Sequence, residues 1–474
     1  MHMDEALSKI DATGSGRWAR GCTRALAMQS LVLALECNVM VFVPACAVDL
    51  EMTVSMQANL VAVPTAGALL GTVFLMPLAD IVGRLSLLIW TSVATCVFSV
   101  LSVFAPTYLS FLLLRTLVGV AGGPFLVAID LLGEYVPPEN RGATVNIANV
   151  GWGVGAFFIN ALAWWCLPQY GWRVLVLLAT LPYFVNVFQI WYLVESPRWL
   201  LTRNRQKEAM DSIRYMAAWN ESPMPCGRLV MEKSESSPIA APMSQEPQMQ
   251  DYASIILETF SAFKGLLHLE NRSLTLAVWG IWATWGFSYV AIVLFQGVSV
   301  GHSENSDQVS LLGVQAAKDC NFDYGFILFV SSAEIVGALL ARPIIDRTDL
   351  GWLGGRRGGQ LVPYLIAALT MPLVATRSQP FVCWAYLARA MIGMGSGVSI
   401  LQIPELYSTE HRATGSAAAN LVSMIAGIFP AFLIFSDLSV TFIGNVIAAV
   451  TALGAALLLW IPEMAKVSLD DVKT

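Results

Sequence analysis

Twelve apolar runs, each about 20 residues long, constrain this chain more than any other feature of its sequence. A helix crosses the roughly 30 Å hydrocarbon core of a bilayer in about 20 residues, so each run is long enough to span a membrane. The runs lack the alternation of polar and apolar residues that membrane β-barrels show. The sequence therefore predicts an all-α membrane protein with twelve transmembrane helices. The predicted spans are residues 25–48, 58–79, 86–104, 108–133, 144–166, 173–193, 273–297, 323–345, 360–376, 381–403, 414–435 and 438–461.

The composition agrees with a membrane protein and excludes several other classes. Hydrophobic residues make up 56% of the 474 residues and charged residues 13%, against roughly 25% charged residues in soluble domains. This balance excludes a disordered chain, a collagen and a small disulfide-stapled scaffold. The formal net charge is -6 and no basic stripe occurs, so we expect no nucleic-acid partner.

The distribution of basic residues predicts the orientation of the spans. With the N-terminus in the cytosol, only Arg173, Lys318 and Arg377 of the 27 Lys and Arg residues fall in loops on the opposite side. We therefore expect both termini to be cytosolic, in a multi-pass protein of the plasma membrane or an intracellular vesicle membrane. In this orientation Cys46 and Cys320 both face the non-cytosolic side, where a bridge between them is one alternative.

One long polar interruption divides the chain into two halves of six spans. It begins with a basic, helix-capable piece, continues through a Pro/Ser-rich stretch that should be mobile, and ends in an amphipathic segment. The predicted organisation is a cytosolic N-terminal segment (1–24), a six-helix half (25–193), a cytosolic loop (194–271), a second six-helix half (272–461) and a cytosolic tail (462–474).

The two halves repeat each other. RTLVGVAGG in span four begins at Arg115, and RAMIGMGSG in span ten begins at Arg389. Each is followed by an acid and, seven residues later, by an arginine. These are Glu134 with Arg141 and Glu405 with Arg412. Duplicated six-span halves are typical of a secondary transporter with a binding site near the bilayer midplane.

Several of these motifs resemble those of the major facilitator superfamily. LADIVGR resembles its loop motif, RTLVG its span-four motif, and VESPRWLL the end-of-span-six motif of its sugar and organic-ion branches. TLAVWGIWATWGFSYVAIVLF, IIDR and PELYSTEHRATG look like the synaptic-vesicle-2-related proteins, which have bacterial nicotinate permeases among their relatives. The resemblance implies two pseudo-symmetric six-helix halves that work by alternating access.

Four charged residues within spans stand out, because each costs at least about 2.5 kcal/mol there and needs a reason. They are Glu36, Arg115, Glu334 and Arg389. Glu36 lies roughly 17 Å from the cytosolic side and Arg115 roughly 19 Å. The resemblance implies that spans one and four are neighbours, so the two side chains can meet near the midplane. Proton coupling, a static pair and the absence of contact remain alternatives for them.

The second half carries its own candidates for a binding site. Glu334 corresponds to an acid of the family and is expected either to bind a cation or proton or to bond to a neighbouring span. Arg389 is expected to bind a substrate carboxylate, to pack within the bundle, or to extend to the outer surface. Trp282 and Tyr289 belong to an aromatic stripe in span seven that faces lipid, forms core or forms a substrate wall. Asn149 is a candidate cavity amide, and the other candidates on spans five and six are Asn146, Asn160, Asn186 and Gln189.

A further set of charges clusters at the cytosolic ends of the spans. The resemblance implies that such groups bridge span ends and close the cytosolic side when the transporter is open outward. Positive-inside topology together with helix capping is the simpler alternative. This predicted gate network comprises Asp80, Arg84, Glu134, Arg141, Glu195, Arg198, Asp346, Arg356, Glu405 and Arg412.

The sequence thus favours a proton-coupled secondary transporter of small organic ions, either organic cations or carboxylates such as nicotinate. A sugar–proton symporter and a non-transporting vesicle protein that binds partners remain alternatives. The ATP-binding loop GxxxxGK[ST], a catalytic Ser/His/Asp set and a metal-ligand cluster are absent from the sequence, so we expect no enzyme activity, cofactor or metal. The expected partners are the substrate, protons and the lipid bilayer, with the protein as a monomer.

Overall fold

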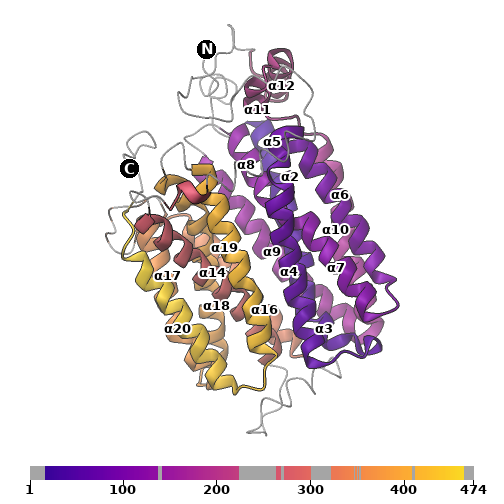
Figure 1. The fold of residues 1–474 in the computed structure, drawn as a ribbon, viewed down its shortest axis with the longest axis vertical. Coiled ribbons are helices and arrows are strands. Elements are labelled where there is room, and N and C mark those ends of the chain that lie inside the picture. Colours follow the sequence, from indigo (N-terminus) through magenta and orange to yellow (C-terminus); the bar gives the residue numbers. More distant parts are fainter. Residues whose placement is uncertain are drawn as a thin grey trace.

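The chain folds into two six-helix halves that lie side by side. In the computed structural model, the described residues are 16–136, 141–223, 263–267, 272–299, 322–345, 347, 349, 351, 354–407 and 412–463. These residues include twelve helices long and apolar enough to cross a membrane, and they contain no β-strand. The N-terminal half, indigo to magenta, lies beside the C-terminal half, salmon to yellow (Figure 1). The predicted all-α fold with twelve spans is confirmed.

The helices follow the predicted spans closely. The N-terminal half consists of α2 (Arg17–Asn38) with η1 (Val39–Val41), α4 (Val54–Leu75), α6 (Arg84–Val103), α7 (Tyr108–Gly122) with η3 (Gly123–Phe125) and α8 (Leu126–Tyr135), α9 (Arg141–Tyr170) and α10 (Trp172–Trp191). The C-terminal half consists of α14 (Arg272–Ser299), α16 (Tyr324–Ala341), α17 (Gly355–Ala375), α18 (Phe381–Leu406), α19 (Arg412–Ile434) and α20 (Val440–Leu458). Shorter helices are α3 (Val43–Cys46), η2 (Val48–Leu50), α5 (Leu78–Val82), α11 (Pro197–Thr202) and α12 (Gln206–Trp219).

The two ends of the bundle are distinguished by the chain path. We call the end at which α2 begins and α20 ends the inner end, and the opposite end, which holds α3, the outer end (Figure 1). Four helices that start at the outer end have a Ser, Thr or Asp side chain that accepts a hydrogen bond from the first turn. These caps are Thr53, Thr107, Asp323 and Ser439. Such caps satisfy N–H groups that the helix itself leaves unpaired.

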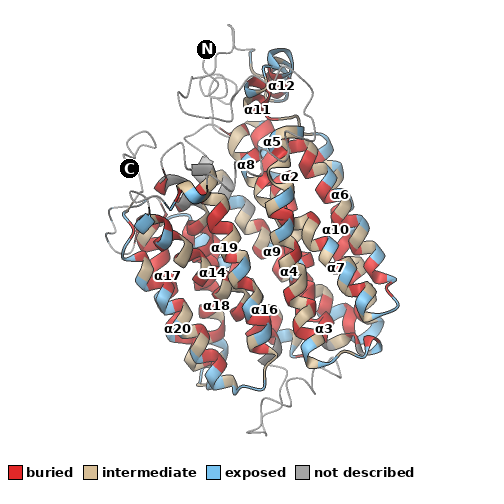
Figure 2. Cartoon of the chain, viewed as in Figure 1, coloured by how far each residue is buried: buried red, intermediate tan, exposed pale blue. Residues whose placement is uncertain are grey.

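Small residues allow close helix packing within each half. A Cβ on Gly119 of α7 would overlap the carbonyl oxygen of Pro64 in α4, and a Cβ on Gly337 of α16 would overlap that of Ala390 in α18. Large apolar side chains instead cover the outside of the bundle, where Trp90 and Leu369 are each 72% exposed. Figure 2 shows exposed residues along the outward sides of the helices. Lipid covers such a surface in a membrane.

The first helix begins earlier than the sequence predicted. The expected span starts at residue 25, whereas α2 begins at Arg17. The first turns of α2 are too polar to be predicted as part of a membrane span. They are helical because α12 packs against them. Trp18 is 4% exposed and its ring meets the rings of Tyr215 and Trp219 edge-on. Its backbone N–H donates to Asn220 Oδ1 at 2.7 Å.

The helix-capable piece at the start of the long loop forms α11 and α12. The predicted mobile stretch, 222–250, and the amphipathic segment, 252–268, lie largely outside the described residues. Cys46 is disulfide-bonded, and Cys320 lies outside the described residues.

Candidate functional site

A cavity of about 320 Å³ lies between the two halves. Both halves contribute to its lining, which includes five of the predicted site residues: Glu36, Arg115, Asn149, Tyr289 and Glu334. The volume lies at the low end of the roughly 300–1,000 Å³ of small-molecule sites. Among the described residues, no group of three His, Cys, Asp or Glu side chains is placed to hold a metal ion. The cavity is therefore of a size for one small organic molecule.

The N-terminal half contributes a buried ion pair to the cavity. Arg115 Nη1 on α7 donates to Glu36 Oε2 on α2 at 2.7 Å, and 2% of each side chain is exposed. Ser99 of α6 and Thr180 of α10 donate to Glu36 Oε1 at 2.6 and 3.2 Å. Arg115 Nη2 also donates to the Ser99 hydroxyl, at 2.9 Å. Four helices thus converge on one carboxylate, and the predicted meeting of Glu36 and Arg115 occurs.

The C-terminal half contributes a second pair at the corresponding place. Arg389 Nε on α18 donates to Glu334 Oε1 on α16 at 2.7 Å, and Arg389 Nη2 lies 2.7 Å from the same oxygen in an ion pair. The two side chains are 4% and 3% exposed. Tyr289 on α14 donates to the same carboxylate at 3.2 to 3.3 Å. Glu334 is therefore hydrogen-bonded to two neighbouring spans. Bonding to a neighbouring span was one of the two alternatives predicted for it.

Two of the predicted site residues of the C-terminal half do not line the cavity. Arg389 is buried and packs against Glu334, which is one of the alternatives left open for it, because pairing with Glu334 offsets the cost of burying both charges. Trp282 does not line the cavity either. It is 5% exposed and packs in the core, with its ring 5.1 Å from that of Trp285. The helical rotation of α14 turns Trp285 and Tyr289 toward the cavity instead.

Aromatic and amide groups complete the lining. Trp152 on α9, which sequence reasoning missed, faces Tyr289 across the cavity with ring centroids 6.3 Å apart. Among the described residues, Trp285 Nε1, Asn146 Oδ1 and Asn420 Nδ2 have no hydrogen-bond partner. All three side chains line the cavity. They offer a bound molecule two donors and one acceptor beside an aromatic wall.

Asn146 and Asn149 line the cavity, but the other polar candidates of spans five and six do not. Asn160 donates to Ala156 O within its own helix, and Asn186 donates to Ala25 O. The Asn186 amide therefore links α10 to α2 within the N-terminal half, whereas the Asn160 amide bonds only within α9.

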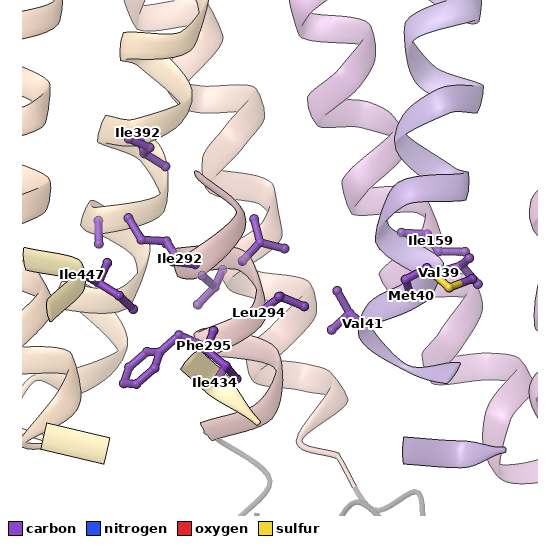
Figure 3. Packing of buried hydrophobic residues seen from close by; sticks show 14 of the residues in the cluster. Val39, Met40, Val41, Ile159, Ile292, Leu294, Phe295, Ile392, Ile434 and Ile447 are labelled. Carbon is purple, nitrogen blue, oxygen red and sulfur yellow. The ribbon is translucent and has the colours of Figure 1, made fainter. Parts of the chain in front are cut away.

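The two halves touch each other at the outer end. The first span changes there from α-helix to the 3₁₀ turn η1, and Phe42 follows, fully buried. Its ring meets Phe322 of the other half at 5.3 Å, edge-on. Figure 3 shows Val41 and Leu294 pointing toward one another from the two halves. Apolar side chains therefore close the outer end of the cavity.

The inner end of the N-terminal half holds a charge network. Arg84 forms ion pairs with Glu134 and, at 3.6 Å, with Asp80. Glu195 accepts hydrogen bonds from three backbone N–H groups at the start of α6, those of Arg84, Leu85 and Ser86. Gly83 takes φ 104° before this helix, and a Cβ there would overlap Glu195. Arg198 lies nearby in α11, half-buried.

In the C-terminal half an acidic side chain likewise accepts hydrogen bonds from the start of a helix. The residue is Glu463, which was not among the predicted members of the gate network. Glu463 accepts hydrogen bonds from the N–H groups of Arg356 and Arg357, the first turn of α17, at 2.8 and 2.9 Å. Gly355 precedes them with φ 74°. The Arg356 side chain donates to Ile345 O at 2.8 Å. The sequence did contain a signal for this role, because Glu463 follows span twelve as Glu195 follows span six.

The remaining members of the predicted gate network cannot be placed. Asp346 and the side chains of Arg141, Glu405 and Arg412 lie outside the described residues.

Comparison with known proteins identifies the family. The family model of the Major Facilitator Superfamily matches residues 25–431. The chain belongs to the major facilitator superfamily. This superfamily member is 27% identical to the "Synaptic vesicle 2-related protein" of Xenopus laevis over 367 residues, which are 75% of this chain and 61% of that relative. It is also 27% identical to the "Organic cation/carnitine transporter 7" of Arabidopsis thaliana, over 90% of this chain and 86% of that one.

Solved structures of superfamily members have the same fold. The proton:xylose symporter XylE, bound to 6-bromo-6-deoxy-D-glucose, matches with a TM-score of 0.69 at 16% sequence identity, over 96% of this chain and 98% of that one. The inward-open conformation of XylE from E. coli matches with a TM-score of 0.67 at 15% identity. These matches confirm the predicted fold, and the family model confirms the family resemblance drawn from the motifs. The fold and the relatives are those of transporters, not enzymes.

Proposed function

We propose that this superfamily member carries small organic ions across a membrane by alternating access, coupled to protons. The observation that carries the proposal is the presence of one buried carboxylate–guanidinium pair in each half, Glu36–Arg115 and Glu334–Arg389, at a shared cavity. Each carboxylate faces the cavity and each is neutralised by its own arginine. Gain of a proton by a carboxylate releases its arginine, and this links protonation to the binding of an anion or to the position of the helices.

The lining of the cavity supports an organic ion with a flat ring or a small cationic head as the substrate. Trp152, Trp285 and Tyr289 supply aromatic faces, which bind rings by stacking and cations through the ring quadrupole. Asn146 and Asn420 supply hydrogen bonds beside them. The two ion pairs leave the lining without net charge, so a charged substrate is best accommodated together with a compensating proton movement.

We further propose that the inner end faces the cytosol, in the plasma membrane or a vesicle membrane. Basic residues are concentrated in the loops of that end, as the positive-inside rule requires. The charge network at the inner ends of the spans then serves as the cytosolic gate, and the apolar contacts of Val41 and Phe42 serve as the outer one.

Uptake by the purified full-length chain in proteoliposomes tests the proposal. Labelled nicotinate, a quaternary ammonium ion and xylose are offered with and without an imposed pH gradient. We expect the gradient to drive accumulation of one of the organic ions, and a protonophore to abolish it. Glu36→Gln should retain exchange of that ion while losing gradient-driven accumulation, and Asp211→Asn on exposed α12 should behave as wild type.

Two outcomes would replace the proposal with its alternatives. Accumulation of xylose alone would make the chain a sugar–proton symporter. Transport of none of the three solutes by well-folded protein would favour a role in partner binding.

A further inference from the structure

A chain of hydrogen bonds crosses the interface between the two halves at the cavity. It begins at Trp152 on α9, whose indole Nε1 donates to the Tyr289 hydroxyl on α14 at 2.5 Å. Tyr289 bonds in turn to the Glu334 carboxylate at 3.2 Å, and Arg389 holds that carboxylate from the other side at 2.7 Å. One residue of the N-terminal half is thereby connected to the buried ion pair of the C-terminal half.

The direction of each hydrogen bond is set by the chemistry of the groups. The indole N–H of Trp152 can only donate, so the Tyr289 oxygen accepts from it. An ionised carboxylate can only accept, so the single hydroxyl hydrogen of Tyr289 points to Glu334. The charge on Glu334 therefore fixes the phenol in the orientation that receives Trp152. Hydrogen bonds to a charged acceptor are roughly twice as strong as neutral ones.

Other side-chain hydrogen bonds between the halves end on uncharged groups. Among the described residues, Asn146 Nδ2 donates to the backbone oxygen of Ala338 at 3.3 Å, and Thr72 donates to the sulfur of Met424 at 3.5 Å. Of the side-chain hydrogen bonds between the described parts of the two halves, only the Trp152 bond leads to a group that can change its charge. The contact between Trp152 of one half and Tyr289 of the other therefore depends on the charge of Glu334.

We infer that Trp152 is the positioning residue through which the charge of Glu334 controls how closely the two halves approach at the cavity. Ionised Glu334 holds the Tyr289 hydroxyl in the orientation in which its oxygen accepts the hydrogen bond from Trp152. This hydrogen bond stabilises the close approach of α9 to α14. Neutral Glu334 releases the phenol hydrogen, and the contact weakens. This inference deepens the proposed function and rests on it, because it assigns the step that links protonation to movement.

In the part of the chain that the structure describes, few charged and titratable groups surround Glu334. Arg389 faces it from α18 and Tyr289 from α14, while α9 presents Trp152 and Gly153, which do not ionise. The Glu36–Arg115 pair faces the same cavity from the other half. Glu36→Gln is therefore included as a background in which any pH response from that pair is removed.

The test measures conformation without any substrate. Spin labels at Leu109 and Thr441, exposed positions at the outer ends of α7 and α20, report the separation of the halves in full-length protein in nanodiscs. In the Glu36→Gln background we expect the distance distribution to shift between pH 8 and pH 5. Trp152→Phe should adopt the acid-type distribution at both pH values, with a roughly tenfold change in the ratio of the two populations at pH 8.

Matched variants keep the inference falsifiable. Trp165→Phe removes an indole from the exposed side of the same helix and should respond to pH as its parent does. Tyr289→Phe should reproduce the effect of Trp152→Phe, and serves if the latter folds poorly. In an added Glu334→Gln background, Trp152→Phe should have little further effect.

A pH response that survives in both Trp152→Phe and Tyr289→Phe would overturn the inference, as would a full Trp152→Phe effect in the Glu334→Gln background. The spin-label distances test the role of Trp152, whereas the uptake assay tests the proposed transport function, so the two can fail independently. Absence of uptake for every solute would overturn the transport proposal alone, while an unaltered pH response in the two variants would overturn the role of Trp152 alone.

Discussion

Glu36 and Arg115 lie 2.7 Å apart in the N-terminal half, and each side chain is 2% exposed. The pair joins the first and fourth spans near the cavity, with Ser99 and Thr180 satisfying the remaining carboxylate oxygen. Either charge alone is costly at this depth, because a buried ion without its partner loses its hydration and gains nothing in return. The stability of the folded protein and the proton coupling proposed above therefore depend on the same two residues.

Removal of one member of this pair should be more damaging than removal of both. Glu36→Gln or Arg115→Gln leaves an unmatched buried group, and we expect each to destabilise the protein by about 3–5 kcal/mol. The double variant should lose less than the sum of the two. Thermal unfolding of the purified protein measures this cycle. Asp211→Asn, which breaks the exposed pair with Arg214, is the control and should cost less than about 1 kcal/mol. Additive single effects would mean that the two side chains are not coupled.

Glu195 and Glu463 should protect the first amides of α6 and α17 in the same way. Glu195→Ala removes the acceptor of three N–H groups, and Glu463→Ala that of two. We expect hydrogen exchange at each helix start to accelerate roughly tenfold or more, since each bond to a charged acceptor contributes about 1.5–3 kcal/mol. Glu208→Ala on exposed α12 should leave both helix starts unchanged. Equal protection in wild type and variants would refute the capping role.

The outer closure should open when a methyl group is added to Gly297. A Cβ at this position would overlap Val41 of the other half, so Gly297→Ala should separate the halves at the outer end. Cys37 lines the cavity as a free thiol and serves as the probe. We expect a membrane-impermeant thiol reagent, added from outside, to label Cys37 several-fold faster in Gly297→Ala. Val41→Ala in the same chain should reverse the effect. Unchanged labelling would show that closure does not depend on this contact.

The outer-end contact of Asp49 should depend on pH. Burial by itself raises the pKa of the Asp49 carboxyl, but hydrogen bonds from Arg173 and Trp172 outweigh it and lower the pKa below its ordinary value. A lowered pKa means that the carboxylate stabilises the folded protein above the ordinary value of about 3.9. This stabilisation is lost as the pH falls through the lowered pKa.

Asp49→Asn should therefore lower the unfolding temperature near pH 7 and lose its effect in strong acid. Because Asp49 is nearly half exposed, we expect less than about 1 kcal/mol at neutral pH. Thermal unfolding of wild type and variant between pH 3 and pH 7 measures the difference. A difference that persists unchanged to the lowest pH would contradict an ionised Asp49 as its source.

The twelve spans and the repeat of two halves were predictable from the sequence by itself. Within a bilayer each backbone N–H and C=O must be satisfied inside its own segment, so a spanning helix appears directly as an apolar run of fixed length. The cost of a charge in lipid likewise marked Glu36, Arg115, Glu334 and Arg389 as residues with a partner or a role. The sequence did not predict that α2 begins as early as Arg17, because contacts with α12 rather than hydrophobicity stabilise its first turns.

Only the tertiary structure decided which residues meet. The sequence left Arg389 without a partner, and the packing of α16 against α18 brought Glu334 to it. Helical spacing showed an aromatic stripe on α14 but not its rotation, which turns Tyr289 to the cavity and Trp282 to the core. Glu463 acquired its role from the nearby start of α17. Local sequence determines whether a segment is helical in lipid, whereas the rotation and neighbours of each helix depend on packing between residues far apart in the chain.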